Sequence, residues 1–192
     1  MKIKNLINSA ITLVILVCNS CSSLEKDLTR LEAVDSKRRH KAVISLANRF
    51  SDKNITSSNY DKIISVLSKT ATEDANYYVK ATALSLLVEN APQHSTSVIL
   101  KCFEDSNSIV REEAVKSAEV LKDVTFTEAL TKALLKDSAV SVRRLCPNAL
   151  ASIALSDSRL IQEVKKILQQ ALEKEEIEAV KFAIKDSLTK LP

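Results

Sequence analysis

Three stretches of this chain repeat nearly the same letters at an almost constant spacing. They read "EDANYYVKATA" from residue 73, "EDSNSIVREEA" from residue 104 and "KDSAVSVRRLC" from residue 136, so the steps are 31 and 32 residues. Self-similarity at a fixed period of about 20 to 50 residues is the signature of stacked repeat units. One unit of this length cannot bury its apolar face alone, whereas stacked units share a continuous core. The spacing therefore predicts a repeat array.

Each unit is expected to hold two helices joined by a turn. A short apolar segment, 95–103, precedes the turn "EDSNS", whose Asp, Asn and Ser side chains favour helix starts. The segment 109–121 then carries one apolar stripe at helical spacing: Val110, Ala114, Ala118 and Leu121. The next unit repeats this pattern with expected helices over 126–135 and 142–155. Pro147 lies inside the latter and predicts either a kink or a later helix start.

The composition supports helices and argues against glycine-dependent sites. The chain has no glycine and only 4% aromatic residues. Glycine is the usual residue where the backbone needs a positive φ, so β-hairpins, phosphate-binding loops and dinucleotide-binding loops are not expected. The formal net charge is +4, and Lys2 and Lys4 supply two of these charges. The rest of the chain is nearly balanced, which does not indicate a nucleic-acid-binding protein.

The first 23 residues have the arrangement of an export signal. They combine two lysines, an apolar stretch from Ala10 to Cys18 and small polar residues. The apolar stretch is too short to span a bilayer, which needs about 20 residues. Its end resembles a bacterial lipoprotein signal, which implies a signal peptide over 1–20, cleavage before Cys21 and acylation of Cys21. An ordinary cleaved signal, an uncleaved anchor and a cytoplasmic chain are the alternatives. A redox or metal site at Cys18 and Cys21 is not expected, because no second ligand pair accompanies them.

The repeat resembles the HEAT-like family, including its short bacterial form related to phycobilisome lyases. An aliphatic helix, an Asp turn and Val-Arg-x-x-Ala carry the resemblance, with copies at Val79-Lys80, Val110-Arg111, Val142-Arg143 and Val180-Lys181 and a degenerate copy near Arg39. The resemblance covers residues 24–190 and implies an all-α fold, an α-solenoid of about five HEAT-like helix hairpins. A compact helical bundle is the alternative. The long connector 50–61 and the lack of Gly at helix ends depart from the family, which leaves the register of the first unit open.

The resemblance also implies an ion-pair ladder. In the family, the acid of each turn and the base of the following helix connect neighbouring repeats. The matching acids are Asp74, Asp105, Asp137 and Glu175, and the matching bases are Lys80, Arg111, Arg143 and Lys181. Exposed ion pairs contribute only about 0–1 kcal/mol each, but partly buried Arg–carboxylate forks can hold register. The role implied for these residues is structural.

One cationic cluster, "KRRHK" over residues 37–41, stands apart from the repeat. It places four cations at the start of an expected helix, where the helix dipole disfavours positive charge. One interpretation is a solvated face, partly offset by Glu32, Asp35 and Asp52. The other is contact with an anionic surface: lipid headgroups, an envelope polyanion or an acidic partner. That second interpretation assigns the contact to Lys37, Arg38, Arg39 and Lys41.

No motif indicates catalysis. His40 and His94 do not stand at metal-binding spacing and no nucleotide loop occurs, so no catalytic residue, metal or cofactor is expected. Cys102 and Cys146 fall on apolar repeat positions and are expected to be buried thiols, with a disulfide as the alternative.

These patterns lead to a predicted function as a scaffold. We expect an exported, lipid-anchored protein of the bacterial cell envelope, on the periplasmic or surface side, that binds a protein partner through the solenoid surface. The membrane contact would be the N-terminal lipid, nucleic acid is not an expected partner, and no oligomeric state is predicted. The alternative is a cytoplasmic HEAT-like regulator or lyase-type accessory protein. The fold alone cannot decide between them.

Overall fold

The computed structural model describes residues 24–52 and 55–192, and this part of the chain is helical without strands. A helix over 24–31 comes first. It is followed by α2 (Ser36–Asn48), α3 (Ser57–Glu73), α4 (Tyr77–Asn90), α5 (Thr96–Cys102), α6 (Ser108–Leu121), α7 (Thr127–Lys136), α8 (Val140–Ser156), α9 (Ile161–Lys174) and α10 (Glu178–Lys190). Short 3-10 helices connect successive hairpins: Arg49–Ser51, Pro92–His94, Val124–Phe126 and Ser158–Leu160.

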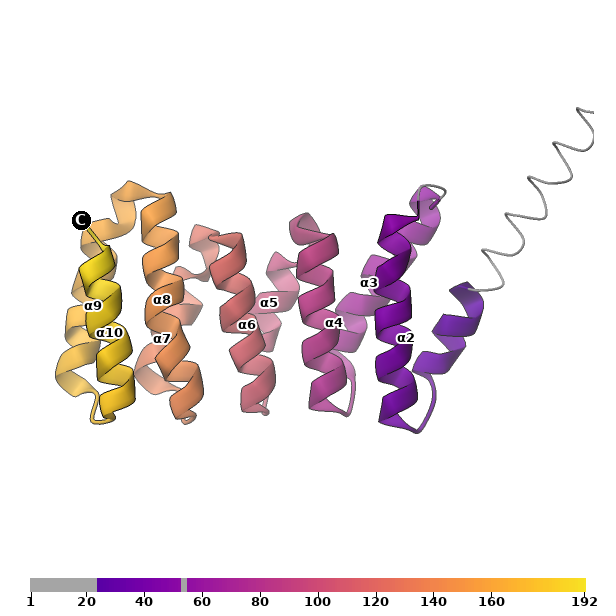
Figure 1. Cartoon of the computed structure of the whole chain (residues 1–192), viewed down its shortest axis with the longest axis horizontal. Helices are drawn as coiled ribbons and strands as arrows, with labels where there is room; N and C mark the ends of the chain where they lie inside the picture. Colours follow the sequence, from indigo (N-terminus) through magenta and orange to yellow (C-terminus); the bar gives the residue numbers. More distant parts are fainter. Residues whose placement is uncertain (1–23, 53–54) are drawn as a thin grey trace, which may run out of the picture.

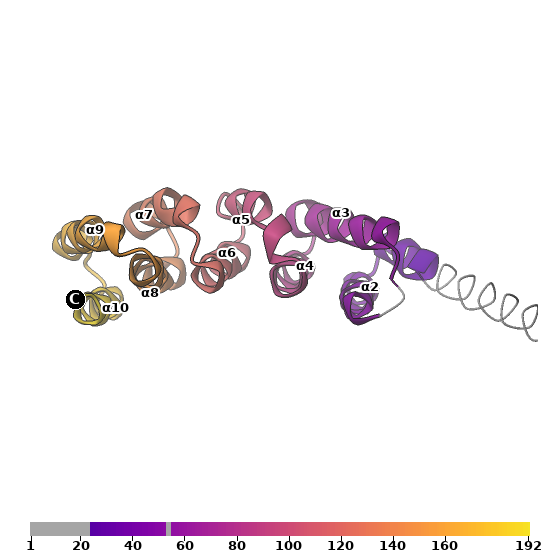
Figure 2. The same ribbon diagram turned by 90° about the horizontal axis from the view of Figure 1, so that it is seen from above.

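The helices form two rows, as Figures 1 and 2 show. The first helices of the hairpins, α3, α5, α7 and α9, make one row, and the second helices, α2, α4, α6, α8 and α10, make the other. Each second helix packs against the next one along the array. The array bends gently with the row of second helices on its inner side (Figure 2). The expected α-solenoid is confirmed, and the alternative of a compact bundle is wrong.

The turns explain how an array can be built without glycine. The first helices α3, α7 and α9 end at an acid whose backbone is extended: Asp74, Asp137 and Glu175, with ψ of 140°, 135° and 137°. An extended exit needs no left-handed residue at the helix end, where glycine is otherwise common. Asn76 and Asn107 then cap α4 and α6 with their side-chain oxygens. Among the described residues only Lys122, after α6, has a positive φ, at 53°.

Small side chains let the second helices pack closely. The position three residues after the repeat base is fully buried in every unit; it holds small residues in the first four units, Ala42, Ala83, Ala114 and Cys146, and the larger Ile184 in α10. The degenerate first copy near Arg39 is therefore α2, in the same register as the others. The expected connector 50–61 is shorter than its letters indicate, because α3 begins at Ser57. Helix α8 runs through Pro147, so a later helix start is wrong.

The last second helix presents a different face from the others. Four residues after the repeat base, the earlier units bury Val43, Leu84, Val115 and Pro147. In α10 this position is Lys185, which is exposed. This face of α10 is therefore polar, whereas the same face of the earlier second helices is apolar and packed.

Candidate functional site

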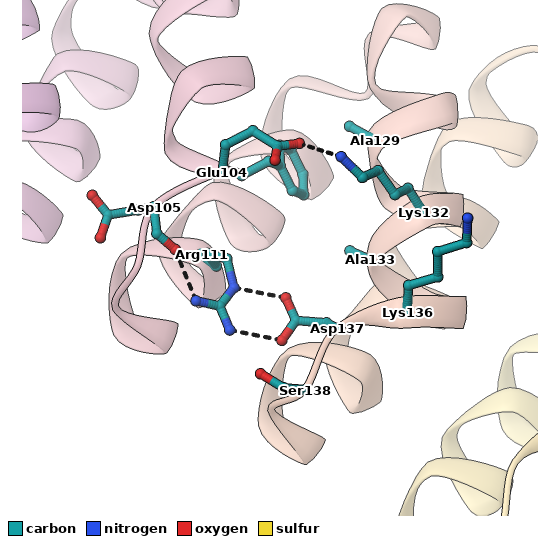
Figure 3. A pocket seen from close by; sticks show the side chains of 10 residues that line it. Glu104, Asp105, Arg111, Ala129, Lys132, Ala133, Lys136, Asp137 and Ser138 are labelled. Carbon is teal, nitrogen blue, oxygen red and sulfur yellow. Dashed lines mark hydrogen bonds and ion pairs between the residues drawn. The ribbon is translucent and has the colours of Figure 1, made fainter.

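Ion pairs cross the interfaces between successive hairpins at the edge of the array. In the interface shown in Figure 3, Arg111 Nε lies 2.7 Å from Asp137 Oδ2 and Arg111 Nη2 lies 2.8 Å from Oδ1. Arg111 Nη1 also donates to the carbonyl oxygens of Asp105, at 2.8 Å, and Ser106, at 3.2 Å. A single guanidinium in the first turn of α6 therefore joins its own turn to the turn of the next hairpin.

Two further arginines repeat this geometry. Arg39 lies 2.7 Å from Asp74 and donates to the carbonyls of Ala33 and Val34, both at 2.8 Å. Arg143 lies 2.8 Å from Glu175 and donates to the carbonyl of Asp137 at 2.9 Å. Each acid also orders its own turn, as when Asp137 Oδ1 accepts the backbone N–H of Ala139 at 2.8 Å.

The two lysines of the expected ladder behave differently. Lys80 Nζ makes one bond, of 2.7 Å, to Asp105 Oδ2 across the interface. Lys181 Nζ instead lies 2.8 Å from Glu178, within its own helix. The structure thus brings Lys80, Arg111 and Arg143 to the acid of the following unit. Lys181 is not part of the ladder, because no described turn follows α10, and Arg39 provides the first base.

The ladder side chains are mostly removed from solvent, with 12% exposure for Arg111 and 7% for Asp137. Burial alone would raise the pKa of Asp137, but hydrogen bonds from Arg111 and Ala139 outweigh it and hold this pKa below its ordinary value of 3.8. The pKa of Asp74 is lowered by the same balance through Arg39 and Asn76. For Glu175, the hydrogen bond from Arg143 is the main cause of a lowered pKa. The geometry suits these charged pairs to holding neighbouring hairpins in register.

The cationic cluster at the start of α2 is divided by this arrangement. Lys37, Arg38 and Lys41 are exposed and form no ion pair within the described residues. Arg39 is only 13% exposed and is committed to Asp74, so its expected place in an anion-binding surface is corrected. The Asp35 carboxylate caps α2 by accepting the backbone N–H of Lys37 at 3.0 Å.

The inner face of the second helices does not repeat its chemistry. The residue directly after the repeat base differs in each unit: His40, Ala81, Glu112, Arg144 and Phe182. His40 Nε2 lies 3.0 Å from Thr82 Oγ1 on the next helix, whereas Glu112 Oε1 accepts a 2.5 Å hydrogen bond from Ser141 Oγ. Phe182 is 74% exposed. A surface whose side chains change along a regular scaffold is suited to recognising a non-repetitive partner.

One ionic cluster has no counterpart in the sequence-based expectations. Asp27, only 2% exposed, accepts bonds from Arg30 at 2.9 Å, Ser45 at 2.8 Å and Arg49 at 2.6 Å. Burial raises the pKa of Asp27, and these bonds lower it further than burial raises it. The cluster attaches the helix over 24–31 to α2. No sequence signal indicated it, because Asp27 precedes the repeated motif.

Cys102 and Cys146 are buried free thiols, as expected, and the disulfide alternative is wrong. Burial raises the pKa of Cys102 to about 12 and that of Cys146 well above its usual range. Thiols with raised pKa values in an apolar environment are unreactive, so both act as small core side chains.

The expected signal peptide over 1–20 and the acylation site Cys21 lie outside the described residues. In the part of the chain that is described, no helix combines the length and apolar character that a membrane span requires. Over the same residues, His, Cys, Asp and Glu side chains are not grouped in a way that could bind a metal ion.

Comparison with solved structures places this fold among repeat scaffolds. One chain in the structure of the complex of CpcE and CpcF of phycocyanin lyase from Nostoc sp. PCC7120 is 19% identical to this chain, with a TM-score of 0.61. The match covers 88% of this chain and 65% of that chain. This chain thus spans less than two thirds of that protein's length. A computationally designed armadillo repeat protein for modular peptide recognition is 18% identical with a TM-score of 0.59, covering 93% and 86%. Another designed armadillo repeat protein, in complex with the peptide (KR)4, is 20% identical with a TM-score of 0.58, covering 93% and 85%.

Sequence comparison agrees with the central part of the array. No curated protein matches the chain. The protein-family model for HEAT repeats matches residues 64–151, which run from α3 to α8. At identities below 25%, the solved structures show the fold alone. The chain is therefore an all-α solenoid of HEAT-like helix hairpins, and its central segment matches the family of HEAT repeats.

Proposed function

We propose that this protein is a non-catalytic scaffold that binds a protein partner through the inner face of its second helices, while an N-terminal lipid holds it at the bacterial cell envelope. The observation that carries the binding function is the inner face itself. Five helices present it on a regular backbone, and the residue after the repeat base changes from His40 to Phe182 along it. One solved neighbour was designed for modular peptide recognition and another is in complex with a peptide, and both support such a use of the fold.

The lipid anchor is supported by the order of residues at the N-terminus. Two lysines, a short apolar stretch and "CNSC" precede the first helix of the array. Expression of the full chain in a bacterium that processes lipoproteins tests the anchor. The intact mass should show loss of residues 1–20 and gain of acyl chains, and Cys21→Ala should move the protein from the membrane fraction to the soluble fraction. An unacylated mass contradicts the anchor.

The binding face is tested separately by photo-crosslinking in the same cells. A photoreactive amino acid replaces Lys116, which is exposed on α6, or Gln169, which is exposed on α9 in the other row. We expect a discrete cross-linked partner from position 116 and none from position 169. Equal products from both positions, or none from position 116, contradict a binding role for the inner face.

A second candidate is a cytoplasmic regulator or lyase-type accessory protein. The fold similarity to the phycocyanin lyase complex favours it. The same mass measurement distinguishes the two candidates, because an intact Met1 and a soluble protein agree only with the second one.

A further inference from the structure

We infer that the groove between α2 and α4 is a docking site for an acidic, extended peptide segment of a protein partner. One apolar side chain of this segment, flanked by the segment's own carboxylates, would enter the groove. The inference deepens the proposed binding function, because it assigns a place and a partner chemistry to one part of the inner face. It does not depend on the lipid anchor.

The groove has a suitable size and lining. Its volume is about 420 Å³, within the range of about 300–1,000 Å³ typical of ligand pockets. Its walls come from two helices and the cap residue of the second: Ser36, Lys37, His40, Lys41, Asn76, Tyr78 and Val79. Tyr78 is 59% exposed, and its ring centroid lies 4.5 Å from that of Tyr77. A tyrosine held in this way offers apolar contact area at little entropic cost, as in many binding hot spots.

The charge at the groove selects the partner. Lys37 and Lys41 line it, are exposed and have no carboxylate partner among the described residues. Asp35, the nearest acid in sequence, is engaged in capping α2. Carboxylates of a bound peptide would supply the missing partners, and an apolar side chain would cover the ring of Tyr78.

The equivalent place between α6 and α8 shows that this groove is not a general feature of the repeat. His40 and Glu112 both follow the repeat base directly, and Tyr78 and Ser141 both precede their bases by two residues. Glu112 and Ser141 are joined by a 2.5 Å hydrogen bond, so an acidic side chain lies at this position between α6 and α8. His40 instead bonds to Thr82, and the aromatic ring of Tyr78 stays accessible.

Arg38 distinguishes a peptide from an anionic membrane as the partner. It is exposed, like Lys37 and Lys41, but does not line the groove. A flat anionic surface would attract all three cations through long-range electrostatics, and each would matter similarly. A peptide seated in the groove depends on Lys37, Lys41 and Tyr78 and only weakly on Arg38. The hollow between the helices favours the peptide, because it needs an inserted side chain to be filled.

The test uses the full chain purified in zwitterionic detergent and fluorescence anisotropy. The probe is a short labelled peptide of aspartates and glutamates around one central leucine, with two controls in which lysines replace the acids or serine replaces the leucine. We expect binding of the first probe only. Lys37→Gln with Lys41→Gln should weaken it about tenfold and Tyr78→Ala about tenfold or more, whereas Tyr78→Phe and Arg38→Gln should change it by less than about twofold. Thermal unfolding of each variant controls for folding, and the exposed lysine pair carries the test if Tyr78→Ala unfolds.

Three outcomes overturn the inference. The first is no binding of the acidic leucine probe by the wild type. The second is binding to phosphatidylglycerol vesicles, without peptide binding, that falls equally with Arg38→Gln and with the lysine variants, which would identify a membrane contact. The third is concentration-dependent self-association that the lysine variants abolish, which would identify a second copy of the chain as the occupant. If cross-linking from position 116 persists in any of these cases, the docking site fails while the proposed scaffold function stands.

Discussion

Two interfaces of the array use the same position for different bases. Arg111, at the interface between the α5–α6 and α7–α8 hairpins, makes two hydrogen bonds to the Asp137 carboxylate and also donates to two carbonyls of its own turn. Lys80, at the interface between the α3–α4 and α5–α6 hairpins, reaches Asp105 through a single 2.7 Å hydrogen bond. A planar guanidinium has five donors in a fixed fork, whereas an ammonium is a point charge on a flexible stem. The comparison teaches that arginine connects two turns through one side chain, while lysine only bridges the gap between them.

Removal of the Arg111 side chain is expected to have the largest effect. Arg111→Ala leaves Asp137 mostly buried without its main partner and two carbonyls without their donor. We expect a loss of about 2–3 kcal/mol in the free energy of unfolding, measured by urea denaturation. Arg159→Ala is the matched control, because Arg159 forms a similar fork with Asp157 but is 87% exposed. A midpoint shift for Arg159→Ala as large as that for Arg111→Ala would contradict the importance of burial.

Low pH is expected to have the second-largest effect, because it weakens the arginine–carboxylate pairs between hairpins. The pKa values of Asp74 and Asp137 lie below the ordinary 3.8, so these acids stabilise the fold above that value and lose this contribution as the pH falls through their folded-state values. Urea denaturation between pH 7 and pH 2 should therefore show decreasing stability below about pH 4. Arg111→Ala should decline less steeply over this range, because Asp137 has already lost the hydrogen bonds from Arg111, which lower its pKa more than the bond from Ala139 does. An identical acid dependence in both proteins would contradict the assignment to this pair.

Conversion of the arginine interface into a lysine interface is a smaller change. Arg111→Lys keeps the charge and one bond to Asp137 but removes the donors to the carbonyls of Asp105 and Ser106. We expect a loss of about 1 kcal/mol by urea denaturation, clearly less than for the alanine variant. Equal losses for lysine and alanine would show that the charge alone contributes nothing.

The reverse change is expected to have the smallest effect and the opposite sign. Arg at position 80 would face Asp105 and, by analogy with Arg111, the carbonyls of Asp74 and Ala75, which lie six and five residues before it. Lys80→Arg should raise the free energy of unfolding by about 0.5–1 kcal/mol. Lys80→Gln serves as the control that removes the charge. No gain from arginine would mean that the second interface cannot accommodate a fork.

The repetition of short motifs allowed much of the fold to be predicted. Every expected helix between residues 95 and 155 is present, since the apolar stripes recur with the helical period and Asn107 in the turn caps α6. The acids and bases of the ladder were identified by their constant separation of six residues. That separation did not identify their partners, because it does not determine which turn faces which helix. The sequence therefore did not indicate that Arg39 belongs to the ladder and Lys181 does not.

The sequence alone determined the class of the protein: a glycine-free chain with one motif at steps of 31 and 32 residues must stack helix hairpins to bury their apolar faces. Only the tertiary structure decided how charges far apart in the chain are shared. Arg39 is mostly buried in an ion pair with Asp74, whereas Lys37 and Lys41 are exposed beside the accessible ring of Tyr78. Asp27 is buried and accepts hydrogen bonds from Arg30, Ser45 and Arg49. The physical reason is that packing depends on periodic local patterns, whereas an ion pair depends on which two side chains the stacked backbone brings within a few ångströms.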